Sequence, residues 1–152
     1  MTSLTIVRVI EAAPEAVFAA FVEPDQLALW WGPDDGPVLS AEVEPRVGGR
    51  FHVRFRLAED GSEHGSSGIF EVFEPPRRLS MSWAWDGDDG PGSRVDVTLR
   101  PVDQGTEVTL VHSRLGDAKA RDEHRHGWEG ALAKLGRQAG RLSRSPWRRP
   151  PP

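Results

Sequence analysis

The chain has 152 residues, a formal net charge of −4 and no cysteine, and this length fits one domain with one sizeable core. The lack of cysteine excludes disulfides, thiolate metal sites and a cysteine nucleophile, and the acidic balance disfavours nucleic-acid binding. The sequence shows no signal-peptide pattern and no apolar stretch near the ~18 residues of a membrane span. We therefore expect a cytoplasmic protein that binds neither nucleic acid nor membrane.

The first part of the chain predicts one strand followed by two short helices. Residues 4–11 are rich in β-branched side chains, which favours a strand. Pro14 stands at a first-turn position that a helix tolerates. A second short helix is expected to carry Trp30 and Trp31, and the Gly/Pro-rich segment 32–37 ends it.

Six further strands are expected, separated by residues typical of turns. They comprise residues 38–43, 50–57, 68–74, 79–85, 95–100 and 108–113. Residues 50–57 give the clearest pattern, because apolar and polar side chains alternate as in a half-buried strand. Strands joined by short turns predict an antiparallel meander.

The last expected element is a long helix from about Asp117 to about Leu142, with Asp117 as its N-cap. An apolar stripe at helical spacing runs along it, formed by His124, Trp128, Ala131, Leu135, Ala139 and Leu142. This helix alone is long enough to cover the apolar face of the meander. We expect residues 1–142 to form a single domain and residues 143–152, rich in Arg and Pro, to form a disordered tail.

Several landmarks follow one another in a fixed order along the chain. They are Ala13-Pro14, Trp30-Trp31-Gly32-Pro33, Gly48-Gly49-Arg50-Phe51, Pro75-Pro76-Arg77-Arg78-Leu79, Trp83, Gly105-Thr106, His112 and Gly127-Trp128. In these motifs, and in its order of elements, the chain from about residue 4 to 142 resembles the START/SRPBCC superfamily, the helix-grip fold of the birch pollen allergen. It is most similar to bacterial proteins related to the C-terminal domain of the activator of the heat-shock chaperone ATPase.

The resemblance implies an α+β fold in which a curved antiparallel sheet wraps the long C-terminal helix and leaves a cavity between them. The candidate ligand-binding residues are the side chains expected to face this cavity. They are Trp30, Trp31, Phe51, Phe55, Phe70, Met81, Trp83, Trp85, Val97, Leu110, His112, His124 and Trp128. The alternative is that these side chains simply fill the core.

His112 and His124 are the only candidates for acid–base chemistry, because both are expected on inward faces and histidine titrates near neutral pH. The alternative is a core histidine whose ring nitrogens are satisfied within the protein. His124 and His126 lie two positions apart and point to different helix faces. No metal-binding spacing occurs in the sequence, so we expect neither a metal nor a cofactor.

Three functions remain open. The first is the binding of an apolar or aromatic small molecule in the cavity, for transport, sensing or sequestration. The second, implied by the resemblance, is a cyclase/aromatase-like or hydratase-like enzyme that uses the same cavity. The third is a co-chaperone of the heat-shock ATPase. The resemblance implies an additional N-terminal domain for that activity, and we do not expect such a domain here. We expect binding rather than catalysis, in a monomer or a homodimer.

Overall fold

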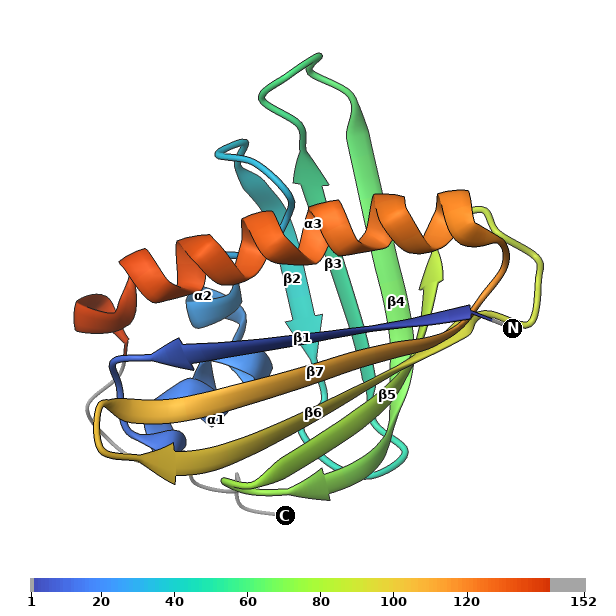
Figure 1. The fold of residues 1–152 in the computed structure, drawn as a ribbon. Helices are drawn as coiled ribbons and strands as arrows, with labels where there is room; N and C mark the ends of the chain where they lie inside the picture. Colours follow the sequence, from blue (N-terminus) through green and yellow to red (C-terminus); the bar gives the residue numbers. More distant parts are fainter. Residues whose placement is uncertain (1, 143–152) are drawn as a thin grey trace.

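Seven strands form one antiparallel sheet in the computed structural model, which describes residues 2–142 (Figure 1). The strands are β1 (Thr2–Ile10), β2 (Val38–Val43), β3 (Arg50–Arg56), β4 (Glu63–Glu74), β5 (Arg78–Trp85), β6 (Ser93–Val102) and β7 (Gly105–Leu115). The helices are α1 (Pro14–Val22), α2 (Pro24–Leu27) and α3 (Ala118–Arg137), and a 3-10 turn, η1 (Ala139–Arg141), follows α3. The expected tail, residues 143–152, lies outside the described residues, and the domain boundary at 142 stays a prediction.

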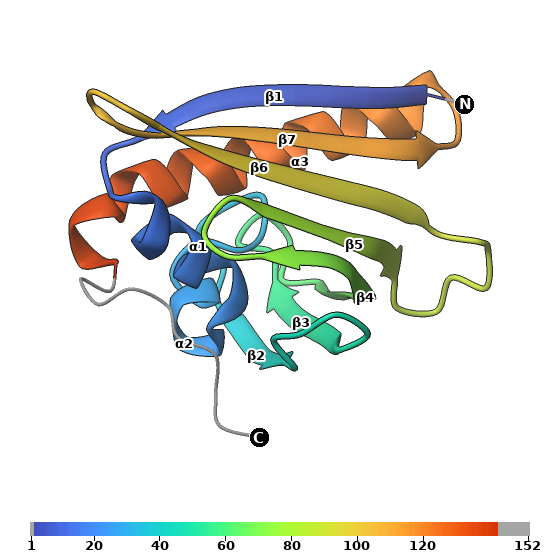
Figure 2. The ribbon, with the colours of Figure 1, turned by 90° about the horizontal axis from the view of Figure 1, so that it is seen from below.

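The strands of the sheet have the order β1-β7-β6-β5-β4-β3-β2. The six strands after α2 therefore follow one another as a meander, and β1 lies beside β7 at the end of it. The sheet is curved, and α3 runs across its concave side (Figure 2). The expected α+β architecture, a curved antiparallel sheet around a long C-terminal helix, is confirmed.

The core lies between the concave face of the sheet and the helices. On β3, Phe51 and Phe55 are buried while Arg54 and Arg56 are exposed, as the period-two pattern predicts. Both arginines pair with Glu63 of β4, at 3.1 and 3.3 Å. Exposed ion pairs of this kind contribute little stability, so the fold depends on the inward face.

The long helix α3 begins as the sequence predicts and ends a little earlier. Asp117 is its N-cap, and the Asp117 carboxylate accepts a hydrogen bond of 2.9 Å from the Ala120 backbone N–H. The α-helix ends at Arg137 and a 3-10 turn follows, so the expected α-helix to Leu142 is too long. The Gln138 N–H is shared between carbonyls three and four positions earlier, a tightening typical of helix ends.

Strand β4 is longer than the sequence predicts. It begins at Glu63, whereas a strand was expected only from residue 68. Residues 63–67 carry no alternation of apolar and polar side chains that would reveal a strand. Their pairing with β3, in which Arg56 lies opposite Glu63, holds this first half in the sheet.

The adjacent Trp30 and Trp31 lie beyond the second short helix, not within it as expected, because α2 ends at Leu27. Trp30 is fully buried, and its indole N–H donates a hydrogen bond of 3.0 Å to the Ala20 carbonyl of α1. Trp31 is 5% exposed and packs edge-on against Trp128 of α3, with ring centroids 5.5 Å apart. The two neighbouring indoles therefore join α1 and α3 to the same segment.

The segment after Trp31 approaches α3 closely at two glycines. A Cβ atom added to Gly130 would lie 2.1 Å from the Pro33 carbonyl oxygen, a distance that no side chain can tolerate. A Cβ atom added to Gly127 would lie 3.9 Å from the Pro33 side chain, which is ordinary contact. Only the absence of a side chain at 130 allows this segment to lie directly on the helix.

We predict opposite effects on stability for two substitutions one helical turn apart. Gly130→Ala should lower the free energy of unfolding by about 1–3 kcal/mol, because the new methyl group displaces the Pro33 backbone. Gly127→Ala should raise it by up to about 1 kcal/mol, because alanine is the better helix former and finds space. Urea unfolding followed by circular dichroism measures both values. Shifts of the same sign and size in the two variants would contradict this account of the contact.

Candidate ligand-binding cavity

A cavity of about 490 Å³ lies between α3 and the strands β3 and β5. Its lining combines large aromatic side chains with a few polar ones. The lining residues are Trp31, Gly32, Pro33, Asp34, Phe55, Leu57, Glu59, Trp83, Trp85, Glu123, His124, His126, Gly127, Trp128 and Ala131. Ligand sites in proteins typically have this size and this mostly apolar character.

Aromatic rings in edge-to-face and stacked contacts form the walls of the cavity. Trp83 and Trp85 lie edge-on with centroids 4.5 Å apart, and the His124 ring of α3 stacks on Trp85 at 5.9 Å. These geometries are the favoured ones for aromatic pairs. Trp85 is 39% exposed although β5 was expected to bury it, so this indole stands where the cavity meets solvent.

Only part of the candidate set from the sequence lines this cavity. Those that do are Trp31, Phe55, Trp83, Trp85, His124 and Trp128. The others are buried in the core and are not among the lining residues: Trp30, Phe51, Phe70, Met81, Val97, Leu110 and His112. The sequence correctly indicated which faces point inward, but an inward face supplies both core and cavity wall.

Asp34 and Glu59, which lie at the mouth of the cavity, were not among the candidate residues from the sequence. Glu59 belongs to a turn and Asp34 to a Gly/Pro-rich segment, and both patterns normally indicate plain surface. Gly127 and Ala131 do carry a signal, because they lie three and seven positions after His124 on the same helix face.

His112 is held by hydrogen bonds on both ring nitrogens. The Trp128 indole N–H can only donate, and it donates to His112 Nδ1 at 3.0 Å. The neutral ring therefore carries its proton on Nε2, which donates to Ser93 Oγ at 2.7 Å. The Ser93 hydroxyl in turn donates a hydrogen bond of 3.0 Å to the Trp83 carbonyl oxygen. Both His112 nitrogens are thus engaged within the protein.

The electrostatics of the two histidines follow from burial. Burial, and to a smaller extent the nearby His124, lowers the pKa of His112 from 6.5 to about 3. Burial also lowers the pKa of His124, against a smaller opposing effect of Glu123. The two rings lie 4.6 Å apart between centroids. Because burial lowers the pKa of each ring below 6.5, both are neutral at pH 7. His124 has no hydrogen bond on its ring within the described part of the chain.

Two further polar atoms beside the aromatic wall lack partners within residues 2–142. They are the Trp83 indole N–H and the Ser66 hydroxyl, and both are buried. Ser66 lies opposite Trp85 in the pairing of β4 with β5. An unpaired buried polar atom is costly, so these two atoms are a local cost to the stability of the fold.

Lys134 and Asp34 hold the mouth of the cavity in place. The buried Lys134 ammonium donates to the carbonyls of Trp31, at 3.0 Å, and of Asp34. The Asp34 carboxylate accepts from the backbone N–H groups of Ala58 and Glu59, at 3.0 and 3.1 Å. One helix side chain therefore fixes the segment after Trp31, and that segment fixes the turn after β3.

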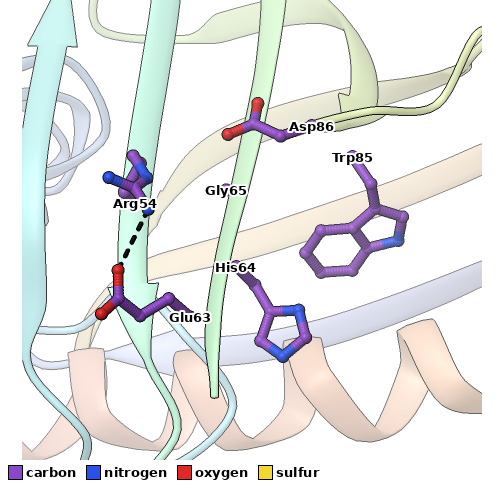
Figure 3. Close-up of a pocket in the computed structure, with 6 residues that line it drawn as sticks. All are labelled: Arg54, Glu63, His64, Gly65, Trp85 and Asp86. Carbon is purple, nitrogen blue, oxygen red and sulfur yellow. Dashed lines mark hydrogen bonds and ion pairs between the residues drawn. The ribbon is translucent and has the colours of Figure 1, made fainter.

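A smaller pocket of about 180 Å³ shares Trp85 with the cavity. Its lining residues include Arg54 and Glu63, which form an ion pair at 3.1 Å, together with His64 and Asp86 (Figure 3). Trp85 therefore borders both an aromatic cavity and a pocket lined by charged side chains.

Neither a metal-binding cluster nor a membrane-spanning helix is present among the described residues. Within residues 2–142, no group of three or more histidine or acidic side chains is arranged to hold a metal ion. In the same range, no helix has the length and apolar character needed to cross a membrane.

Comparison with known proteins gives a consistent result. The family model described as Activator of Hsp90 ATPase homolog 1-like protein matches residues 11–139. The solved structure of the AHSA1 protein from Silicibacter pomeroyi is 29% identical, with a TM-score of 0.80, over 91% of this chain and 98% of that one. An AHSA1-like protein from Aeromonas hydrophila is 27% identical, with a TM-score of 0.77, over 97% and 100%. A Rhodobacter sphaeroides protein is 28% identical, with a TM-score of 0.78, over 93% and 95%.

No curated protein matches the chain. A curved antiparallel sheet around one long helix is the fold of the START/SRPBCC class. Within that class, the chain belongs to the family of Activator of Hsp90 ATPase homolog 1-like proteins.

We predict that His112 makes the stability of the protein depend on pH. Its folded pKa of about 3 lies below the value of about 6.5 for an unfolded chain. The unfolded state therefore takes up the proton first as pH falls. The contribution is complete above about pH 6.5 and is lost as pH falls toward about 3. Between about pH 7 and pH 5, His112 alone should lower the free energy of unfolding by about 2 kcal/mol.

Urea unfolding at the two pH values tests this prediction. His112→Gln should lose about 2 kcal/mol of the change in the free energy of unfolding between the two pH values, whatever its effect on stability at pH 7. His126→Gln, a change at an exposed position of the same helix that carries His124, should keep this change. An unchanged pH dependence in His112→Gln would show that another group is responsible.

Proposed function

We propose that this protein binds an apolar or aromatic small molecule in the cavity between the sheet and α3, for transport, sensing or sequestration. The observation that supports this most is the aromatic wall formed by Trp31, Trp83, Trp85 and Trp128 around a space of about 490 Å³. A concave apolar space with a few polar groups is the usual form of a ligand site.

Binding is favoured over catalysis because the cavity lacks a convergent acid–base set. Of the two candidate histidines, His112 has both nitrogens engaged within the protein. His124 remains as a neutral ring on the wall. Within residues 2–142 it is hydrogen-bonded to none of the carboxylates that line the same cavity, so the paired acid and base that proton-transfer enzymes use is not assembled there. The family name refers to activation of the Hsp90 ATPase, and nothing in the described residues favours that activity here. Cytoplasmic location and a monomeric or homodimeric state remain predictions.

We predict saturable binding of N-phenyl-1-naphthylamine, a neutral aromatic dye whose emission rises in apolar surroundings. A dissociation constant in the micromolar range, about −8 kcal/mol, is expected. Trp85→Ala should weaken binding by about tenfold, since it removes part of the wall. Because Trp85 is 39% exposed, this change should alter stability only slightly.

The control is Ile69→Ala, which removes an exposed apolar side chain, 42% exposed, that does not line the cavity. Its affinity should equal that of the unaltered protein. Dye binding that does not saturate, or equal losses in the two variants, would mean that the dye adheres to the surface and that the cavity is not the site.

A further inference from the structure

The charged side chains that line the cavity all carry the same sign. They are Asp34, Glu59 and Glu123, and neither a lysine nor an arginine lines it. Glu59 and Glu123 are exposed, and Asp34 is partly buried at the mouth. One carboxylate comes from the segment after Trp31, one from the turn after β3 and one from α3, so the mouth is acidic on several sides.

The Asp34 carboxylate keeps its negative charge. Burial by itself would raise its pKa, but hydrogen bonds from the backbone N–H groups of Ala58, Gly36 and Glu59 hold the pKa below its ordinary value. The nearby Lys134 ammonium lowers it further. Asp34 therefore contributes a fixed charge at any pH near neutrality.

The positive groups near the mouth do not face the cavity. Lys134 is buried behind the segment after Trp31, where its ammonium donates to two backbone carbonyls. Arg137 lies one turn further along and pairs with Asp35 at 3.6 Å. Burial keeps His124 neutral. A ligand in the cavity therefore meets carboxylates, aromatic rings and the imidazoles of His124 and His126, and neither a lysine nor an arginine lines the space around it.

Indole is the best aromatic partner for a cation, because its ring face carries negative electrostatic potential. The cavity has four tryptophans on its wall and carboxylates at its mouth. From this combination we propose that the ligand is an organic cation: a flat apolar or aromatic body that carries an ammonium group. This inference rests on the proposed function and adds the sign of the ligand's charge.

The same arrangement disfavours anionic ligands such as fatty acids. A carboxylate in this cavity would lie near Glu59, Glu123 and Asp34 with no lining lysine or arginine to pair with it. An unpaired charge taken out of water is strongly unfavourable. The cavity thus selects by repulsion of anions as well as by attraction of cations.

A matched set of naphthalene probes tests the inference, because the three share one aromatic body. They are naphthalen-2-ylmethylammonium, naphthalen-2-ylmethanol and naphthalene-2-carboxylate. Isothermal titration calorimetry at low salt should show the ammonium probe binding at least about tenfold more tightly than the carboxylate, with the alcohol between them. Raising the salt from about 20 mM to about 500 mM should shrink the difference, since exposed charges are screened.

A double variant removes two of the mouth charges without changing the shape of the cavity. In Glu59→Gln/Glu123→Gln the preference for the ammonium probe over the carboxylate should fall to about twofold. The matched control is Glu11→Gln/Glu129→Gln, which changes the net charge equally at exposed positions that do not line the cavity. This control should keep the full preference.

The outcomes separate this inference from the proposed function. If the alcohol binds and the carboxylate binds as tightly as the ammonium probe, the cavity is a ligand site and the inferred charge of its ligand is wrong. An equal loss of preference in both double variants would assign the effect to net charge and overturn the inference in the same way. If none of the three probes binds, the proposed function itself fails.

Discussion

The contact between α3 and the segment after Trp31 is the constraint on which the cavity depends. The Lys134 ammonium is buried, and a buried charge is tolerated only where it is hydrogen-bonded. Its donors reach the carbonyls of Trp31 and Asp34, and Gly130 lets the Pro33 backbone lie directly on the helix. These contacts fix the position of the segment. The Asp34 carboxylate then holds the turn after β3 by accepting hydrogen bonds from the backbone N–H groups of Ala58 and Glu59. One face of one helix thereby sets two sides of the cavity mouth.

A second set of contacts joins the same helix to strands β7, β6 and β5 of the sheet. The chain of donors from Trp128 through His112 and Ser93 to the Trp83 carbonyl is complete and has one direction. It runs from α3 to β7, then to β6 and β5. Because His112 is neutral at pH 7, the chain needs no buried ion. A satisfied polar network of this kind orients the Trp128 indole more narrowly than apolar packing would.

Much of the fold follows from the sequence, and part of the cavity does as well. The alternation in β3 and the helical stripe through His124 and Trp128 indicate which faces point inward, since both patterns depend on local periodicity. The early start of β4 does not follow from its polar residues 63–67, because only pairing with β3 makes them a strand. Trp30 and Trp31 are neighbours of one residue type, yet one enters the core and the other the cavity wall.

The contacts that hold the mouth of the cavity could not be predicted from the sequence, for a different reason. Lys134 and Asp34 belong to residue types that are usually solvated, and their roles arise only when segments 100 residues apart in the chain meet. A lysine on a helix and an aspartate in a turn carry no periodic signal of such a contact. Chemistry that depends on tertiary contacts between ordinary polar residues has to be read from the structure.

The indole N–H groups show how polar anchors fix the tryptophans around the cavity. Trp128 lines the cavity and its N–H donates to His112, whereas Trp30 lies in the core and its N–H donates to the Ala20 carbonyl. Trp31 packs edge-on against both rings, with centroids 5.4 Å from Trp30 and 5.5 Å from Trp128. The two anchored indoles therefore hold Trp31 in place, and it cannot rotate to fill the cavity beside it, although filling it would gain dispersion contacts.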